Sequence, residues 1–135
     1  MRGTPALGFL FLVSLPAFGA TLSPGYQKCI DATDTNAGWT QCSDQEIKRQ
    51  EARLRAVWNE AYTLIKKTST QSAKMLLNEQ RAWIKFKDSA CNFYGSGDFG
   101  REGQVSVNSC KAEQIADRVE TLFNLVKELR ERFGG

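Results

Sequence analysis

Residues 107–132 read VNSCKAEQIADRVETLFNLVKELRER, and this stretch decides the fold class. Its apolar residues return every three or four positions, as they do on one face of an α-helix. They are Ala112, Ile115, Ala116, Val119, Leu122, Phe123, Val126 and Leu129. At about 1.5 Å per residue such a helix would span roughly 40 Å. The segment therefore predicts the long helix of an α-helical bundle.

Two earlier segments carry the same period. Residues 44–68 repeat apolar side chains from Ile47 to Ile65, and residues 70–93 do so from Ala73 to Ile84. Ser43 followed three residues later by Glu46 indicates a capping box at the start of the first of these helices. Because only a short TST break separates the two helices, we expect them to be antiparallel neighbours.

A shorter helix is expected over residues 24–33, where Tyr26 and Ile30 are its apolar members. No stretch of the chain alternates apolar and polar residues as a strand does. The sequence thus predicts an all-α fold, a small antiparallel bundle of three long helices plus a short N-terminal helix.

Residues 1–19 have the layout of a signal peptide. Arg2 precedes an apolar run over residues 7–18, and small residues follow, so we expect cleavage after Gly19 or Ala20. The alternative, a transmembrane anchor, is disfavoured because the run is shorter than the roughly 20 residues that a bilayer requires and contains Pro16. The first cysteine, Cys29, lies beyond the cleavage region, so the sequence does not favour a lipid anchor.

Residues 20–135 then form a single domain, which we expect in the periplasm or outside a bacterial cell. Loss of Arg2 leaves 17 Lys and Arg against 15 Asp and Glu, a net charge of +2. Such a small excess does not indicate a nucleic-acid partner. We also expect no stable membrane insertion after cleavage, and the sequence does not indicate an oligomeric state.

The four cysteines fall into two local pairs. Cys29 and Cys42 flank the connection into the first long helix, and Cys91 and Cys110 flank the glycine-rich stretch before the last one. Disulfides persist in oxidising compartments, so we expect each pair to form a bond that closes one connection between helices. A crossed connectivity is the alternative.

The glycine-rich stretch, GSGDFG at residues 95–100, matches the pattern G-x-G-x-x-G. A dinucleotide site needs this pattern between a strand and a helix, whereas here it follows a helix and lies in a predicted disulfide loop. The alternative is a surface loop that contacts a partner protein, because exposed aromatic residues often anchor interfaces. Its candidate contact residues are Phe93, Tyr94, Asp98 and Phe99.

The composition argues against an enzyme. The chain has no histidine, which is the commonest general base and metal ligand, and paired cysteines supply neither a nucleophile nor a zinc site. Glu79 and Asp88 are nine residues apart and lie on different faces of their helix. We therefore predict no catalytic, metal-binding or cofactor-binding residue, and no cofactor.

The stretch QRAWIKFKDSAC, residues 80–91, is the most specific motif. Gln80 interrupts an apolar stripe, and a buried amide needs hydrogen-bond partners. Asn59, Tyr62 and Arg118 are candidate partners for Gln80. The alternative is that Gln80 edges the core and reaches water, and Trp83 is most simply a core residue.

The order of these motifs resembles the lysozyme-inhibitor LprI-like N-terminal domains, which are small exported bacterial proteins. The resemblance rests on Cys29 and Cys42, then WNEAYTLI at 58–65, QRAWIKFKDSAC at 80–91, Cys110, and Arg118 before Leu122. Trp58 stands where the family motif has leucine, and Lys87 where it has arginine. Arginine's two-pronged hydrogen bonding would be lost at that position.

The resemblance implies an exported helical domain with paired cysteines, in a family named for lysozyme inhibition. Its motif residues are Asn59, Tyr62, Gln80, Trp83, Asp88 and Arg118, and their pattern indicates architecture rather than an inhibitory surface. We therefore hypothesise a protein-binding domain whose partner is lysozyme or another cell-wall hydrolase. The alternative function is a structural or small-ligand-binding periplasmic domain, distinguished by a pocket near Gln80 and Arg118.

Overall fold

The computed structural model of the protein describes residues 22–133. Helices α1 (Pro24–Asp31), α2 (Asn36–Thr68), α3 (Thr70–Asn92) and α4 (Gly103–Phe133) follow one another, with the short 3₁₀ helices η1 (Phe93–Gly95) and η2 (Gly97–Glu102) between α3 and α4. The predicted all-α fold, with three long helices and a short N-terminal one, is confirmed.

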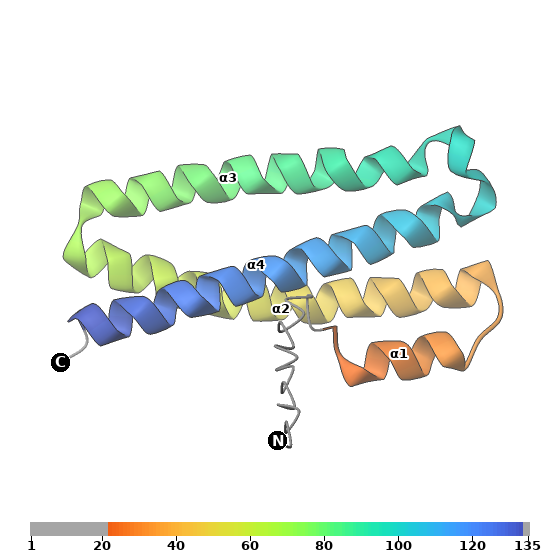
Figure 1. The fold of residues 1–135 in the computed structure, drawn as a ribbon, viewed down its shortest axis with the longest axis horizontal. Helices are drawn as coiled ribbons and strands as arrows, with labels where there is room; N and C mark the ends of the chain where they lie inside the picture. The colour runs from red at the N-terminus through yellow and green to blue at the C-terminus, as the bar shows by residue number, and fades with distance from the viewer. Residues whose placement is uncertain (1–21, 134–135) are drawn as a thin grey trace, which may run out of the picture.

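The three long helices alternate in direction along the chain. In Figure 1, α3 returns antiparallel to α2, and α4 then runs beside α2 in the same direction. The most extensive packing in the bundle is between α2 and α4. Helix α1 lies against the first half of α2 (Figure 1), so the bundle has a core pair of helices with α1 and α3 packed on it.

The hydrophobic core lies between α2 and α4. Val57 and Ala61 of α2 meet Val119, Leu122 and Val126 of α4, and all five side chains are buried. Leu54, Trp58 and Leu64 of α2, with Leu76 and Leu125, pack around this cluster but stay partly exposed. Full burial of a side chain such as valine or leucine contributes about 1.5–3 kcal/mol. This burial is the main stabilisation of the bundle.

The start of α2 differs from its prediction. The helix begins at Asn36 rather than at residue 44, and the side chain of Thr35 caps it by accepting a hydrogen bond from Gly38 N at 3.1 Å. Ser43 and Glu46 are therefore inside the helix and completely buried. The predicted capping box is wrong, because the Glu46 carboxylate bonds to Ser23 in the preceding segment instead of to its own helix start.

Both predicted disulfides are confirmed. Cys29 pairs with Cys42 and joins α1 to α2, with the two Cα atoms 5.7 Å apart. Cys91 pairs with Cys110 and joins α3 to α4, with a Cα separation of 5.5 Å. The crossed connectivity is thereby excluded, and each bond closes one connection between consecutive helices.

The predicted signal peptide, residues 1–19, and its cleavage sites after Gly19 or Ala20 lie outside the described residues. Within residues 22–133, none of the helices combines the length and the apolar character that crossing a membrane requires.

Candidate functional site

An aromatic cluster projects from the connection between α3 and α4. The rings of Phe93, Tyr94 and Phe99 pack edge to face or tilted, with centroid separations of 5.6 Å for Phe93 and Tyr94, 5.2 Å for Phe93 and Phe99, and 5.7 Å for Tyr94 and Phe99. Such pairs contribute about 0.5–1.5 kcal/mol beyond their buried area. The three residues, here called the aromatic triad, are nevertheless 63%, 39% and 42% exposed, respectively.

The backbone around the triad is fixed at three points. The Cys91–Cys110 disulfide joins the two ends of the connection. Gly100 has a φ of +65°, a backbone conformation that is unfavourable for residues other than glycine. A Cβ atom on Gly103 would lie 2.8 Å from the carbonyl oxygen of Tyr94, so the first turn of α4 packs directly on the triad's backbone. The connection is therefore ordered into 3₁₀ turns.

The GSGDFG stretch occupies these turns between two helices. It follows α3 rather than a strand, so it lacks the strand-to-helix setting in which this pattern holds a pyrophosphate. Asp98, the fourth predicted contact residue, is exposed in the first turn of η2 and adds a carboxylate beside the triad.

A second cluster joins α3 to α4 through Arg118. Its Nε donates to Oε1 of Gln80 at 2.8 Å, and its terminal nitrogens donate to both carboxylate oxygens of Glu79. The guanidinium carbon also lies 5.6 Å from the centroid of the Trp83 ring. Because Gln80 and Arg118 are each only 8% exposed, this is a largely buried charge with hydrogen-bonded partners.

The other motif residues lie apart from Gln80. Tyr62 stacks on Trp58 with centroids 5.7 Å apart, and Asn59 is exposed on α2. Neither forms a hydrogen bond with Gln80 among the described residues. Asp88 accepts a hydrogen bond from Lys87 Nζ at 2.6 Å. The structure thus brings Gln80, Trp83 and Arg118 together but leaves Asn59, Tyr62 and Asp88 outside that cluster.

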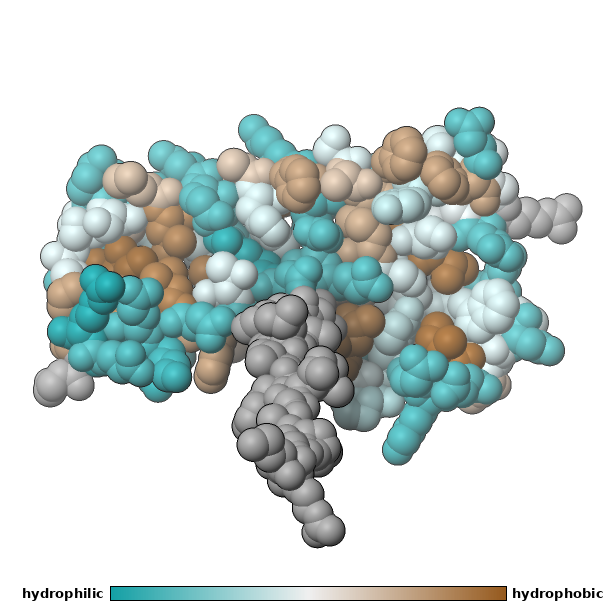
Figure 2. All heavy atoms as spheres, viewed as in Figure 1, coloured by the Kyte–Doolittle hydropathy of each residue, from teal (hydrophilic) through white to brown (hydrophobic). Residues whose placement is uncertain are grey.

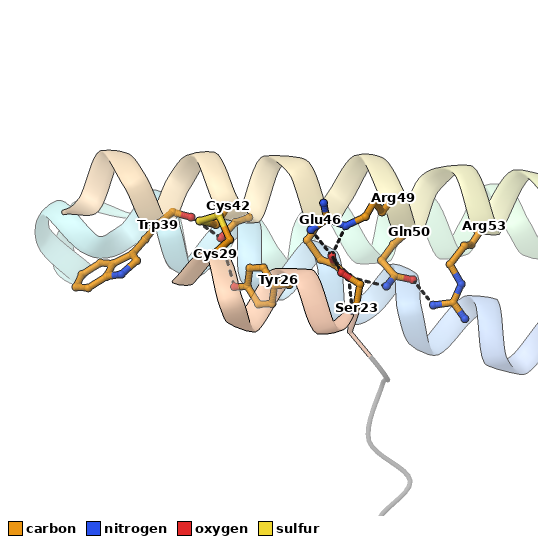
Figure 3. A network of polar contacts seen from close by, with 10 residues as sticks. Ser23, Tyr26, Cys29, Trp39, Cys42, Glu46, Arg49, Gln50 and Arg53 are labelled. Carbon is orange, nitrogen blue, oxygen red and sulfur yellow. Dashed lines mark hydrogen bonds and ion pairs between the residues drawn. A yellow bond between two sulfur atoms is a disulfide. The ribbon is translucent and has the colours of Figure 1, made fainter. Parts of the chain in front are cut away.

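A third polar cluster, which none of the sequence motifs predicts, joins the start of α1 to α2 (Figure 3). The buried Glu46 carboxylate accepts hydrogen bonds from Ser23 N at 2.8 Å and Ser23 Oγ at 2.5 Å. It also accepts one from Gln50 Nε2 at 2.7 Å and one from Arg49 Nε at 2.8 Å. The polar row at positions 43, 46 and 50, on one face of the helix, was the signal that could have revealed this cluster.

Burial would by itself raise the pKa of Glu46, because it disfavours the charged carboxylate. The hydrogen bonds from Ser23, Gln50 and Arg49 outweigh burial and lower the pKa from 4.5 to about 2. The Glu46 carboxylate is therefore ionised near neutral pH, and its hydrogen bonds to Ser23 hold the start of α1 against α2 (Figure 3).

An open groove of ≈ 450 Å³ runs between α2 and α3. Helix α2 lines it with Glu51, Leu54, Arg55 and Trp58, and helix α3 lines it with Leu77, Gln80, Arg81 and Ile84. Trp58, one of the two residues that depart from the family motif, forms part of its wall. Figure 2 shows apolar side chains along α3 and between the helices, on a surface that is otherwise largely hydrophilic.

Among residues 22–133, no cluster of three or more His, Cys, Asp or Glu side chains is placed to hold a metal ion. The triad is an exposed apolar surface, and the groove is lined by apolar side chains together with Glu51, Arg55 and Arg81. The alternative function requires a pocket near Gln80 and Arg118. Gln80 lines the groove, whereas Arg118 reaches it only through its hydrogen bond to Gln80.

Comparison with known proteins places the chain in a family. The family described as "Lysozyme inhibitor LprI" matches residues 29–122. An uncharacterized protein of Rhizobium meliloti (strain 1021) is 26% identical over 134 residues, covering 91% of this chain and 94% of that protein. The uncharacterized protein YecT of Escherichia coli (strain K12) is 33% identical over 76 residues, covering 50% of this chain and 46% of YecT. No solved structure matches the chain. Because the family match covers most of the chain, including all four cysteines, the protein belongs to the lysozyme inhibitor LprI family.

Proposed function

We propose that the protein is an exported envelope domain that binds a cell-wall hydrolase, such as lysozyme, through the aromatic triad and blocks it. The family match and the signal-like residues 1–19 support export and the class of target. Two disulfides fit this location, because such bonds persist in the periplasm and outside the cell.

The exposed triad is the observation that carries the proposal. Phe93, at 63% exposed, is bulky and apolar, yet it is held in place by Tyr94 and Phe99. Aromatic side chains that are already ordered lose little conformational entropy on binding, and they are common hot spots of interfaces. The disulfide next to the triad limits motion of its backbone further.

Local charge supports the choice of target. Common lysozymes are strongly basic, and the processed chain is also slightly basic. Electrostatic attraction between the two must therefore come from a local acidic part of this protein's surface. Helix η2 contains Asp98, Arg101 and Glu102, a net charge of −1, and the exposed Asp98 directly precedes Phe99 of the triad. An apolar triad flanked by carboxylates is therefore suited to the rim of a basic enzyme's cleft.

Surface plasmon resonance on immobilised lysozyme tests this binding mode. Replacing Phe93 and Phe99 together by serine should weaken binding by about 30-fold or more, because loss of a hot-spot aromatic costs about 2 kcal/mol or more. Phe133→Ser is the matched control, since Phe133 is 60% exposed at the far end of α4. Equal binding by the double variant and the wild type would contradict docking through the triad.

A second function, binding of a small ligand in the envelope, is favoured by the groove between α2 and α3. The groove borders Gln80, whose amide is held by Arg118, and its volume lies within the roughly 300–1,000 Å³ of small-molecule sites. This function requires no enzyme target, so it is tested independently of lysozyme binding.

A further inference from the structure

We infer that the groove between α2 and α3 binds a small anionic amphiphile, a carboxylate or phosphate carried on an apolar chain. This inference rests on the second proposed function, small-ligand binding, and names the chemical class of the ligand. It does not depend on the aromatic triad or on lysozyme.

The shape of the groove follows from two matching helical rows. Helix α2 contributes positions 51, 54, 55 and 58, and helix α3 contributes positions 77, 80, 81 and 84. Each row spans eight residues, or about 10 Å from its first residue to its last. Because the two helices are antiparallel (Figure 1), the middle residues of one row face the middle residues of the other. Arg55 and Arg81 therefore both lie near the middle of the groove.

The two arginines favour an anion. Neither guanidinium forms an ion pair with any acidic side chain in the part of the chain that the structure describes. Glu51, one turn before Arg55, also lines the groove, so the lining carries two positive charges against one negative charge. Two neighbouring cations repel each other unless a negative charge lies between them. A carboxylate or phosphate would accept hydrogen bonds from both.

Gln80 supplies a further donor in the groove. Its Oε1 accepts from Arg118, whereas its Nε2 donates to no group within residues 22–133. No fully buried side-chain nitrogen or oxygen of these residues lacks a partner, so Nε2 retains contact with solvent, and Gln80 is one of the residues that line the groove. A side chain that is 8% exposed thus directs an unused N–H donor at the site. An oxygen-bearing ligand would satisfy it.

The remaining walls fit an apolar chain. Leu54 and Trp58 on α2 are only partly buried, and Leu77 and Ile84 on α3 complete the apolar lining. The Trp58 ring is held by stacking on Tyr62, so this wall is formed before a ligand arrives. Cations at mid-groove and apolar side chains on either side match a ligand with one charged group and one hydrocarbon chain.

The test is a titration of the full processed chain with small probes. Calorimetry measures binding, and NMR of the Gln80 side-chain amide locates it. Decanoate and decyl phosphate, below their micelle concentrations, are the two anionic probes, and they distinguish a carboxylate from a phosphate source. Decyltrimethylammonium carries the opposite charge on the same chain, and acetate carries the charge without the chain. We expect one anionic amphiphile per protein molecule, with the Gln80 Nε2 resonances shifted, and no saturable binding of the other two probes.

The double variant Arg55→Gln, Arg81→Gln should weaken binding of the anionic probe by about tenfold or more. Lys85→Gln, an exposed change of charge one turn beyond Arg81, should leave it unchanged. If decyltrimethylammonium binds equally well in the groove, small-ligand binding stands and the anionic class is wrong. If neither anionic amphiphile binds, the inference is wrong, whereas small-ligand binding in the groove fails only if ligands of other classes do not bind there either. Equal affinity of the double variant and the wild type for the anionic probe would also overturn the inference. So would binding that leaves the Gln80 Nε2 resonances unshifted.

Discussion

Arg118 of α4 donates through Nε to Oε1 of Gln80 on α3, at a distance of 2.8 Å, and both side chains are nine-tenths buried. This bond connects the two helices across 38 residues of sequence. It also fixes the orientation of the Gln80 amide, because Oε1 accepts the hydrogen bond from Arg118 and Nε2 remains available on the groove side. Stability of the bundle and the chemistry of the groove therefore depend on the same pair of residues.

Replacing Arg118 by lysine should destabilise the fold although it keeps the charge. Lysine cannot reproduce the bond to Gln80 together with the paired bonds to Glu79. A buried acceptor left without its donor costs about 1–3 kcal/mol, and urea unfolding would measure that loss. Arg130→Gln is the control, because the Arg130–Glu60 pair is exposed and contributes about 1 kcal/mol at most. Equal stability of the lysine variant and the wild type would contradict the role assigned to Arg118.

Stability should fall in acid because of Glu46. Its pKa is about 2 in the folded protein and 4.5 as a reference, so the folded state favours the ionised carboxylate. The stabilisation is complete above pH 4.5 and is lost as the pH falls toward 2, with a size of the order of 3 kcal/mol. Urea unfolding at several pH values should show this loss in the wild type. Glu46→Gln should be less stable at pH 7 and should show a much weaker pH dependence below 4.5, whereas the exposed change Glu120→Gln should retain it.

The periodic features of the fold were predictable from the sequence, but contacts between distant segments were not. Helices α3 and α4 follow from apolar repeats that any reader of the sequence can count. The disulfides follow from cysteines on either side of each connection, although Cys42 lies inside α2 rather than before it, because that helix begins at Asn36. Glu46 was misassigned because a capping box is a local pattern, and its actual partner, Ser23, belongs to another segment.

The candidate site was predictable to a similar degree. The pairing of Gln80 with Arg118 could be anticipated, because a polar residue in an apolar stripe needs a partner. The groove could not, since its two rows of side chains meet only when α3 folds back along α2. Phe93, Tyr94 and Phe99 were expected in a loop, but their mutual packing depends on the 3₁₀ turns that the sequence did not reveal.

Gly103→Ala should displace the aromatic triad. The added methyl group would meet the Tyr94 carbonyl oxygen at 2.8 Å, and relieving such a contact typically costs about 1–3 kcal/mol. We expect a lower free energy of unfolding and a changed near-ultraviolet circular dichroism signal from the triad. Gly97→Ala is the matched control, because a methyl group there has no neighbour within 4 Å. Identical behaviour of the two variants would show that the turn does not depend on this contact.

Removing the second disulfide should weaken the same region. The double variant Cys91→Ser, Cys110→Ser opens a loop with a sequence separation of 19 residues, whose closure contributes about 3 kcal/mol in the chain-entropy account. Thermal unfolding should therefore occur at a lower temperature, and binding to lysozyme should weaken because the triad loses its attachment. A variant as stable as the wild type would mean that packing of α3 on α4 alone holds the connection.

The most direct measurement of the proposed function is the rate at which lysozyme degrades peptidoglycan while the processed, oxidised protein is titrated in. Binding through the triad predicts a saturable fall in the rate, and the Phe93→Ser, Phe99→Ser double variant should require a much higher concentration than the Phe133→Ser control for the same fall. An unchanged rate at a large molar excess of the wild-type protein would contradict inhibition of lysozyme.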